Sequence, residues 1–245
     1  MKYVIISILI GLGVSTQAQG LKGLIKKATQ DSSSPLKKVI NTSSSSLNTD
    51  EVAAGLKEAL VKGTENSTKK LSGTDGFFKD AVIKILLPEE IKKVEGTLRM
   101  FGMGKQVDEA VLSMNRAAED AAKSAAPIFI NAIKGMTIQD AWGILKGGDS
   151  SATRYLRDKT TSSLTTAFKP VIEASLAKVN ATKHWEALFT NYNKVSKNKV
   201  NTDLAAYVTD KALAGIFYQV ALEEMSIRKD PLARTTDILK KVFGN

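Results

Sequence analysis

The spacing of its apolar residues is the feature that most constrains the fold of this chain. From Thr49 almost to the C-terminus they recur every three or four positions. This spacing gathers apolar side chains on one face of an α-helix, whereas a half-buried strand needs them at every second position. Ala, Leu, Lys and Glu fill these segments and are strong helix formers. The 5 prolines and 17 glycines lie mostly between the periodic segments. The pattern predicts an all-α fold.

Turn signals divide residues 50–245 into roughly ten predicted helices, which we expect to form a single multi-helix domain behind a flexible N-terminal segment. The sequence contains no repeat of fixed period, which argues against a solenoid. Between the first two helices, Gly73–Asp80 is predicted as a loop, and the alternation of apolar residues up to Pro88 predicts a brief extended segment. The expected helices are Asp50–Leu71, Pro88–Phe101, Lys105–Ala126, Pro127–Gly135, Thr137–Lys146, Asp149–Phe168, Pro170–Val179, Thr182–Val195, Asp203–Arg228 and Pro231–Phe243.

Residues 1–18 have the three-part layout of a secretory signal peptide. Met1-Lys2 is a short positive start, Tyr3–Val14 is an apolar run, and Ser15–Ala18 offers small residues for cleavage after Ala18. The apolar run is shorter than the ~20 residues that a transmembrane helix needs. We therefore expect export to the periplasm or the exterior. The alternative is an uncleaved N-terminal anchor.

Residues 19–49 are rich in Ser, Thr and Lys and are predicted to form a flexible linker. Such a segment buries too little apolar surface to offset its chain entropy. Gln19–Leu47 carries five lysines and one acid, and Leu21–Ala28 is a short basic amphipathic piece. The first interpretation is a solvated linker. The second is weak contact with an anionic membrane surface.

Most common chemistries lack their motifs in this sequence. With no cysteine, disulfides, thiolate chemistry and a lipoprotein anchor are excluded. The single histidine, His184, argues against a zinc site and is interpreted as a helix-surface or capping residue. Gly102–Lys105 lacks the spacing of a phosphate-binding loop. We expect no cofactor and no metal.

The net charge of +10 makes nucleic acid a candidate partner, because its phosphates attract basic proteins. However, the lysines of the helical region are spread over many helices, and no basic–aromatic interleaving occurs. A signal peptide also argues against such a partner. We therefore expect no nucleic-acid binding.

One set of polar residues falls within or beside predicted apolar helix faces. On a helical wheel, Glu224 lies inside the apolar stripe of the last long helix, and Arg228 follows it at i+4, a spacing that permits an ion pair. Asn115 and Glu119 flank the alanine-rich stripe of another helix, and Arg116 and Asp120 are predicted to pair on its outer side. The candidate cluster comprises Asn115, Arg116, Glu119, Asp210, Glu224, Arg228 and Arg234.

Two interpretations of this cluster compete. It is either a buried polar network that fixes the register of the helices, or a polar pocket that binds a small ligand or supports carboxylate chemistry. A glutamate enclosed in the interior would favour the first interpretation. An open cleft with two carboxylates and an arginine would favour the second.

Several sequence blocks resemble a family of exported bacterial proteins catalogued as domain of unknown function 4197. The resemblance covers nearly all of the helical region. It is carried by Gly55–Leu60, Gly63–Asn66, Asp75–Phe77, Leu87–Glu89, Met114–Glu119, Ala152–Tyr155, Tyr207–Leu213, Glu223-Glu224, Ile227-Arg228 and Ala233–Gly244.

This resemblance implies an exported helical domain and supplies no catalytic residues. The sequence therefore predicts a non-catalytic binding or structural component of the bacterial envelope, whose partner is an unidentified protein or small ligand. The alternative is a carboxylate-based hydrolase or small-anion-binding protein that uses the Glu/Asp/Arg cluster.

Overall fold

The computed structural model describes residues 48–102, 104–182 and 203–230, together with residues 185, 186, 190, 193, 194, 199, 240 and 242. Every regular element in these ranges is a helix, which confirms the all-α prediction. The predicted signal peptide and all but the last two residues of the predicted linker lie outside the described residues. No helix among the described residues combines the length and the apolar character that crossing a membrane requires.

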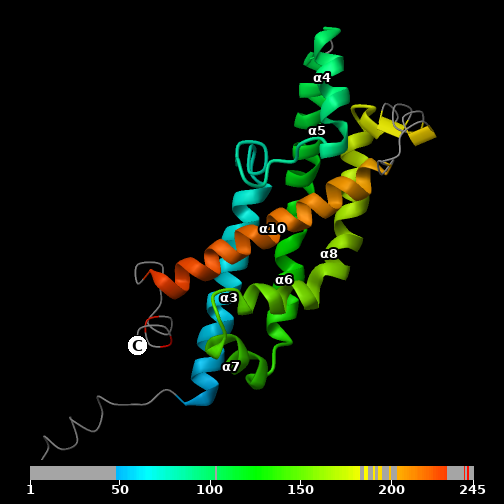
Figure 1. The fold of residues 1–245 in the computed structure, drawn as a ribbon. Coiled ribbons are helices and arrows are strands. Elements are labelled where there is room, and N and C mark those ends of the chain that lie inside the picture. The colour runs from blue at the N-terminus through cyan, green and yellow to red at the C-terminus, as the bar shows by residue number, and fades with distance from the viewer. Residues whose placement is uncertain are drawn as a thin grey trace, which may run out of the picture. The chain divides into compact units, whose positions relative to one another are not determined.

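The described helices are α3 (Thr49–Ser72), the 3₁₀ helix η1 (Glu89–Ile91), α4 (Lys92–Met100), α5 (Gly104–Ala122), α6 (Ala125–Lys134), α7 (Ile138–Lys146), α8 (Ser151–Ala177) and α10 (Leu204–Lys229) (Figure 1). The described part of the chain thus contains fewer helices than the roughly ten expected. One reason is α8, which continues through Pro170 where the sequence predicts a break. The predicted helices over Thr182–Val195 and Pro231–Phe243 fall largely outside the described residues.

Side-chain caps fix where three of the helices begin. Asn48 accepts a hydrogen bond from the Glu51 amide, and the Glu51 side chain accepts one from the Asn48 amide. This reciprocal capping box starts α3 at Thr49, one residue before the Asp50 expected from the sequence. Thr137 and Asp140 form the same box on α7. Asp203 caps α10, and its bond from the Ala206 amide is the main cause of the lowered pKa of its carboxyl.

The segment between α3 and η1 is not helical and packs its aromatic and aliphatic side chains inward. Phe77, in the predicted loop, is fully buried. Beyond it, the buried Ile83 and Ile85 alternate with the exposed Val82 and Leu86. This alternation agrees with the predicted extended segment, and residues 84–88 have no regular secondary structure.

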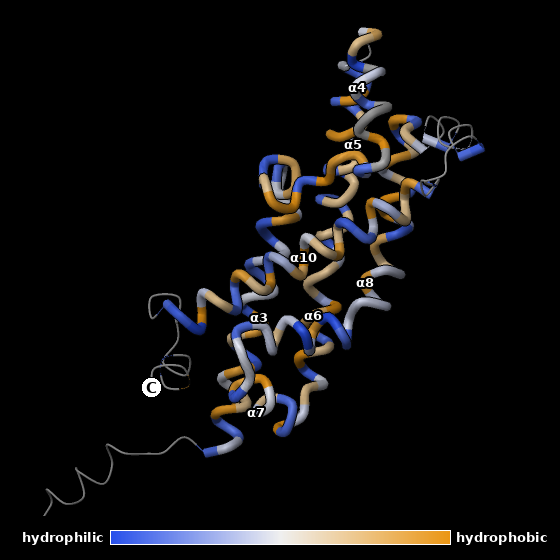
Figure 2. Tube along the Cα trace, viewed as in Figure 1, coloured by the Kyte–Doolittle hydropathy of each residue, from blue (hydrophilic) through white to orange (hydrophobic). Residues whose placement is uncertain are grey.

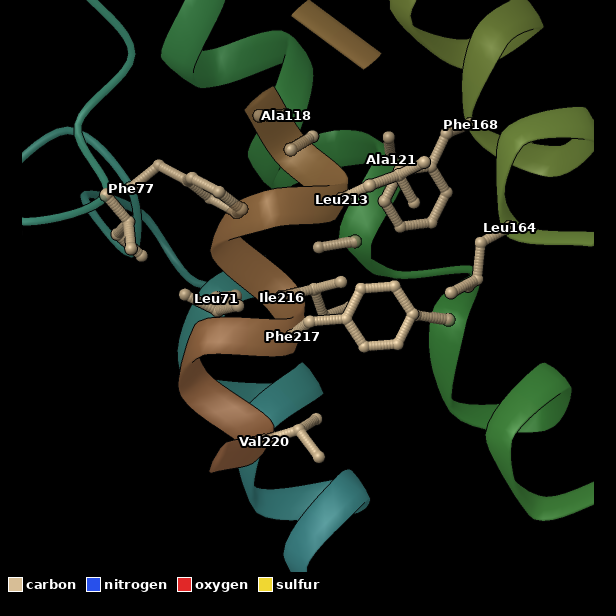
Figure 3. Close-up of a cluster of buried hydrophobic side chains, with 14 of the residues drawn as sticks. Leu71, Phe77, Ala118, Ala121, Leu164, Phe168, Leu213, Ile216, Phe217 and Val220 are labelled. Carbon is tan, nitrogen blue, oxygen red and sulfur yellow. The ribbon is translucent and has the colours of Figure 1, made fainter. Parts of the chain in front are cut away.

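The core lies where α10 packs against α3, α5 and α8 (Figure 1). Hydrophilic and hydrophobic positions alternate along the described helices, as their amphipathic patterns require (Figure 2). In the second half of α5 the buried apolar residues are small, and its alanines 117, 118, 121 and 122 are fully buried. Large side chains from the neighbouring elements fill the space beside them, including Phe77, Phe168 and Phe217 (Figure 3). Phe217 meets Phe129 of α6 edge to face at 5.9 Å.

Candidate functional site

Glu224 is enclosed, and its carboxylate caps another helix. Its Oε1 accepts a hydrogen bond from the Ala152 amide at 3.0 Å, and its Oε2 accepts from the Thr153 amide at 2.9 Å and the Thr153 hydroxyl at 2.8 Å. These two residues form the first turn of α8, where the amides have no partner within the helix. The amide ends of a helix also carry partial positive charge, which stabilises a carboxylate.

Arg228 completes this arrangement. Its guanidinium donates to Oε1 of Glu224 at 3.0 and 2.9 Å, which confirms the predicted i to i+4 pair. Its Nη2 also donates to the Ile144 carbonyl, in the last turn of α7, at 2.9 Å. One pair on α10 therefore holds the end of α7 and the start of α8. We call this set the Glu224 clamp.

Glu119 has a similar role at the loop that follows α3. Its Oε1 accepts hydrogen bonds from the amides of Phe77 and Phe78 at 3.1 and 3.2 Å. Its Oε2 accepts one from Arg116 at 2.6 Å. Arg116 also donates to Asp75 at 2.6 Å, so the guanidinium bridges two carboxylates.

These contacts shift the pKa of the groups on the loop. The pKa of Asp75 is lowered, first by its hydrogen bond from Lys79 and then by that from Arg116. The pKa of Arg116 is raised, mainly by Glu119 and then by Asp75. The network therefore favours the ionised forms of Asp75 and Arg116 and holds the loop against α5.

Asn115 pairs with the backbone of the next segment. Its Oδ1 accepts from the Ile85 amide and its Nδ2 donates to the Ile85 carbonyl, both at 2.8 Å. The side-chain amide of Asn115 thus forms with Ile85 the two backbone hydrogen bonds that a neighbouring strand would form in a sheet. Because both partners are backbone groups, Asn115 positions this segment and has no unused polar atom to offer a ligand.

The structure does not bring all seven predicted residues together. The hydrogen bonds of the Glu224 clamp share no residue with those that join Glu119, Arg116 and the loop after α3. Asp210 is exposed on α10 and joins neither set, because its position at the edge of the apolar stripe turns toward solvent. Arg234 lies outside the described residues, as does His184.

The predicted pairing of Arg116 with Asp120 is wrong. Arg116 turns toward Glu119 and Asp75 instead, because the loop after α3 folds against that side of α5. Asp120 accepts from Lys123 at 2.8 Å and from Ser175 of α8 at 3.1 Å. These bonds lower the pKa of Asp120, with Lys123 as the main cause.

A groove of about 600 Å³ lies elsewhere, between residues 82–89 and α10. Sequence reasoning missed it. A signal was present, because Tyr207, Lys211, Ala214 and Tyr218 recur at i, i+4, i+7 and i+11 and thus line one stripe of α10. The opposite wall could not be recognised in advance, since no pattern links an irregular segment to a helix more than a hundred residues later.

Both buried glutamates are fully engaged in hydrogen bonds within the protein. Every carboxylate oxygen of Glu119 and Glu224 accepts at least one hydrogen bond from the protein, and each side chain is 5% exposed. Among the described residues, no group of three or more acidic or histidine side chains gathers in a way that would hold a metal ion.

Fold and site together define an all-α protein whose interior carboxylates cap a helix and a loop. Residues 46–244 match a family described as a protein of unknown function, DUF4197, and the chain belongs to this family. No curated protein and no solved structure matches it.

Proposed function

We propose that this protein is an exported, non-catalytic helical component of the bacterial envelope that binds a partner protein or a small ligand. The observation that carries the non-catalytic part is the bonding of Glu224. A general acid or base must reach the substrate within hydrogen-bond distance. The oxygens of Glu224 instead face the amides of Ala152 and Thr153 and the guanidinium of Arg228.

The same argument applies to Glu119. Its partners are the amides of Phe77 and Phe78 and the side chain of Arg116, all within the protein. A hydrolase built on these two carboxylates would have to break bonds that hold the fold. The geometry therefore favours the interpretation of a polar network that fixes helix register.

Export is supported by the sequence of residues 1–18, with a positive start, an apolar run and small residues before the expected cleavage after Ala18. The lysines of residues 19–47 would then provide weak attraction to an anionic membrane surface in the envelope. The mature protein should therefore bind anionic vesicles in a salt-sensitive way, and deleting residues 19–47 should abolish this binding.

A test of the non-catalytic role substitutes Glu224→Gln. The glutamine keeps the shape but presents an NH₂ group to backbone donors and removes the charge opposite Arg228. We expect the free energy of unfolding to fall by about 2–4 kcal/mol, measured by urea denaturation followed by circular dichroism.

Asp210→Asn is the matched control, because it removes an exposed acid of the same helix and should stay within about 0.5 kcal/mol of the wild type. Cells carrying Glu224→Gln should keep the function of the gene at a temperature where the variant remains folded. A variant of unchanged stability that behaves in cells like a gene deletion would contradict the proposal.

A further inference from the structure

The groove between residues 82–89 and α10 has the size of a small-molecule site. Its volume of about 600 Å³ falls inside the range of about 300–1,000 Å³ typical of such sites. Its lining is largely apolar and includes Val82, Leu86, Leu87, Pro88 and Ala214. Val82 is 67% exposed and Leu86 52% exposed. A ligand that covers such exposed aliphatic side chains removes apolar surface from water, which favours binding.

The walls of this groove are held in place from behind. Asn115 pairs with both backbone groups of Ile85, and the Tyr207 hydroxyl donates to the Leu86 carbonyl at 2.8 Å. Phe77 projects from the loop toward α10 (Figure 3). There it packs so closely on Gly215 that a Cβ at that position would lie 2.5 Å from the ring. A groove fixed in this way exists before any ligand arrives, which lowers the entropic cost of binding.

Two lysines lie in the lining, each with its ammonium over an aromatic ring, and Lys84 also lies within electrostatic range of Asp108. The ammonium of Lys84 lies 4.0 Å from the centre of the Phe78 ring, and that of Lys211 lies 5.6 Å from the centre of the Tyr207 ring. Neither ammonium forms an ion pair with a carboxylate of the described residues. Glu89 is the one acid of the lining, so the lysines outnumber it. Tyr218 adds a hydroxyl on the same stripe of α10.

We infer that this groove binds an amphipathic organic anion, whose carboxylate or phosphate meets Lys84 and Lys211 and whose apolar body covers Val82, Leu86 and Leu87. A simple inorganic anion would leave the apolar wall in water, and a neutral apolar molecule would leave Lys211 without an anionic partner and Lys84 with only the long-range attraction of Asp108. The inference rests on the proposed binding role, which it makes specific. Membrane lipids and soluble organic acids both provide this chemistry.

The test titrates the mature protein, residues 19–245, with decanoate and with decyl phosphate. Trp185 stacks on Tyr207 at 6.2 Å between ring centres, so its fluorescence reports on the groove. Replacing the second tryptophan, Trp142→Phe, isolates that signal. We expect both decyl anions to change the fluorescence saturably, decanol to bind more weakly, and acetate and inorganic phosphate to leave it unchanged.

Two variants locate the site. Lys84→Gln combined with Lys211→Gln should weaken decanoate binding about tenfold, since each exposed ion pair contributes modestly. The control pair Lys62→Gln and Lys105→Gln makes the same change of charge outside the groove and should leave affinity unchanged. Ala214→Phe places a ring in the groove from an exposed position and should abolish binding of both anions while the protein stays folded.

A second experiment distinguishes a membrane lipid from a soluble organic acid as the natural ligand. Molecules that co-purify with the protein from its native envelope are extracted and identified by mass spectrometry. Failure of both decyl anions to bind, or binding unchanged by the double lysine variant or by Ala214→Phe, overturns the groove assignment. In that case, a molecule that still co-purifies with the Ala214→Phe variant would show that the protein binds a ligand at a site other than the groove. If no molecule or protein co-purifies with the wild type either, the binding role fails as well.

Discussion

At the scale of single residues, the same solution occurs twice in this protein. Glu119 and Glu224 each project from a helix into the interior, accept backbone amides of a distant segment, and bind an arginine one turn away on their own helix. Burying a carboxylate is unfavourable unless its charge and its lone pairs are both satisfied. The two arginines and the four backbone amides meet this requirement, which explains why ionised groups persist inside apolar faces.

Asp75 provides a prediction at this scale. Its backbone has a φ of 69°, a conformation that asparagine also tolerates, so Asp75→Asn removes the charge without adding backbone strain. Because Lys79 and Arg116 lower the pKa of Asp75 in the folded state, its carboxylate stabilises the fold above the unfolded pKa of about 3.9. That stabilisation is lost as the pH falls through the lower, folded pKa.

The difference in free energy of unfolding between wild type and Asp75→Asn should therefore be largest near pH 6 and shrink below about pH 4. Urea denaturation at several pH values measures it. Asp158→Asn, at an exposed site on α8, is the matched control for the loss of one surface carboxylate. An equal loss at pH 6 and pH 3 for Asp75→Asn would show that its charge has no part in holding the loop.

At the scale of the elements, close approach between segments depends on glycine. Gly76 lies where a Cβ would be 2.5 Å from the Lys70 carbonyl oxygen, so the loop can fold back on the end of α3 only with glycine there. Gly215 likewise lets α10 contact the ring of Phe77.

Gly215→Ala should destabilise the protein by about 1–3 kcal/mol, because the added methyl group has no space beside the buried ring of Phe77. Thermal unfolding followed by circular dichroism measures this change. Gly143→Ala on α7 is the matched control. No atom lies within 4 Å of its added Cβ, so helix propensity should raise stability by up to about 1 kcal/mol. A harmless Gly215→Ala would show that the loop and α10 do not pack as closely as described.

At the scale of the whole molecule, α10 joins helices that are far apart in the described sequence. It packs against α3, α5 and α8, and through Arg228 it also reaches the end of α7. The Glu224 clamp at α7 and α8 and the hydrogen bonds of Glu119 to the loop after α3 thus join segments that are far apart in sequence. Unfolding of any of these contacts is expected to affect the others, as in a cooperative domain.

Export gives the prediction that belongs to the complete chain. If residues 1–18 are a signal peptide, the protein recovered from the envelope should begin at Gln19, because the small residues before it permit cleavage after Ala18. Intact-mass measurement and N-terminal sequencing would establish this. Replacing Ala18 with a large residue such as tryptophan should block processing. Recovery of the full-length chain from wild-type cells would favour the uncleaved anchor instead.

The sequence by itself determined the helical character of this protein, because apolar spacing and capping residues are local properties that act within one or two turns. It also indicated that Glu224 lies in an apolar stripe with Arg228 beside it. Local patterns could not say that Pro170 would lie inside a continuous helix, or that Asp210 would face solvent. Only the tertiary structure decided which distant amides the glutamates accept, why Arg116 binds Glu119 and Asp75 rather than Asp120, and that residues 82–89 form a groove with α10. These outcomes depend on contacts between segments separated by tens to more than a hundred residues, and no local pattern carries that information.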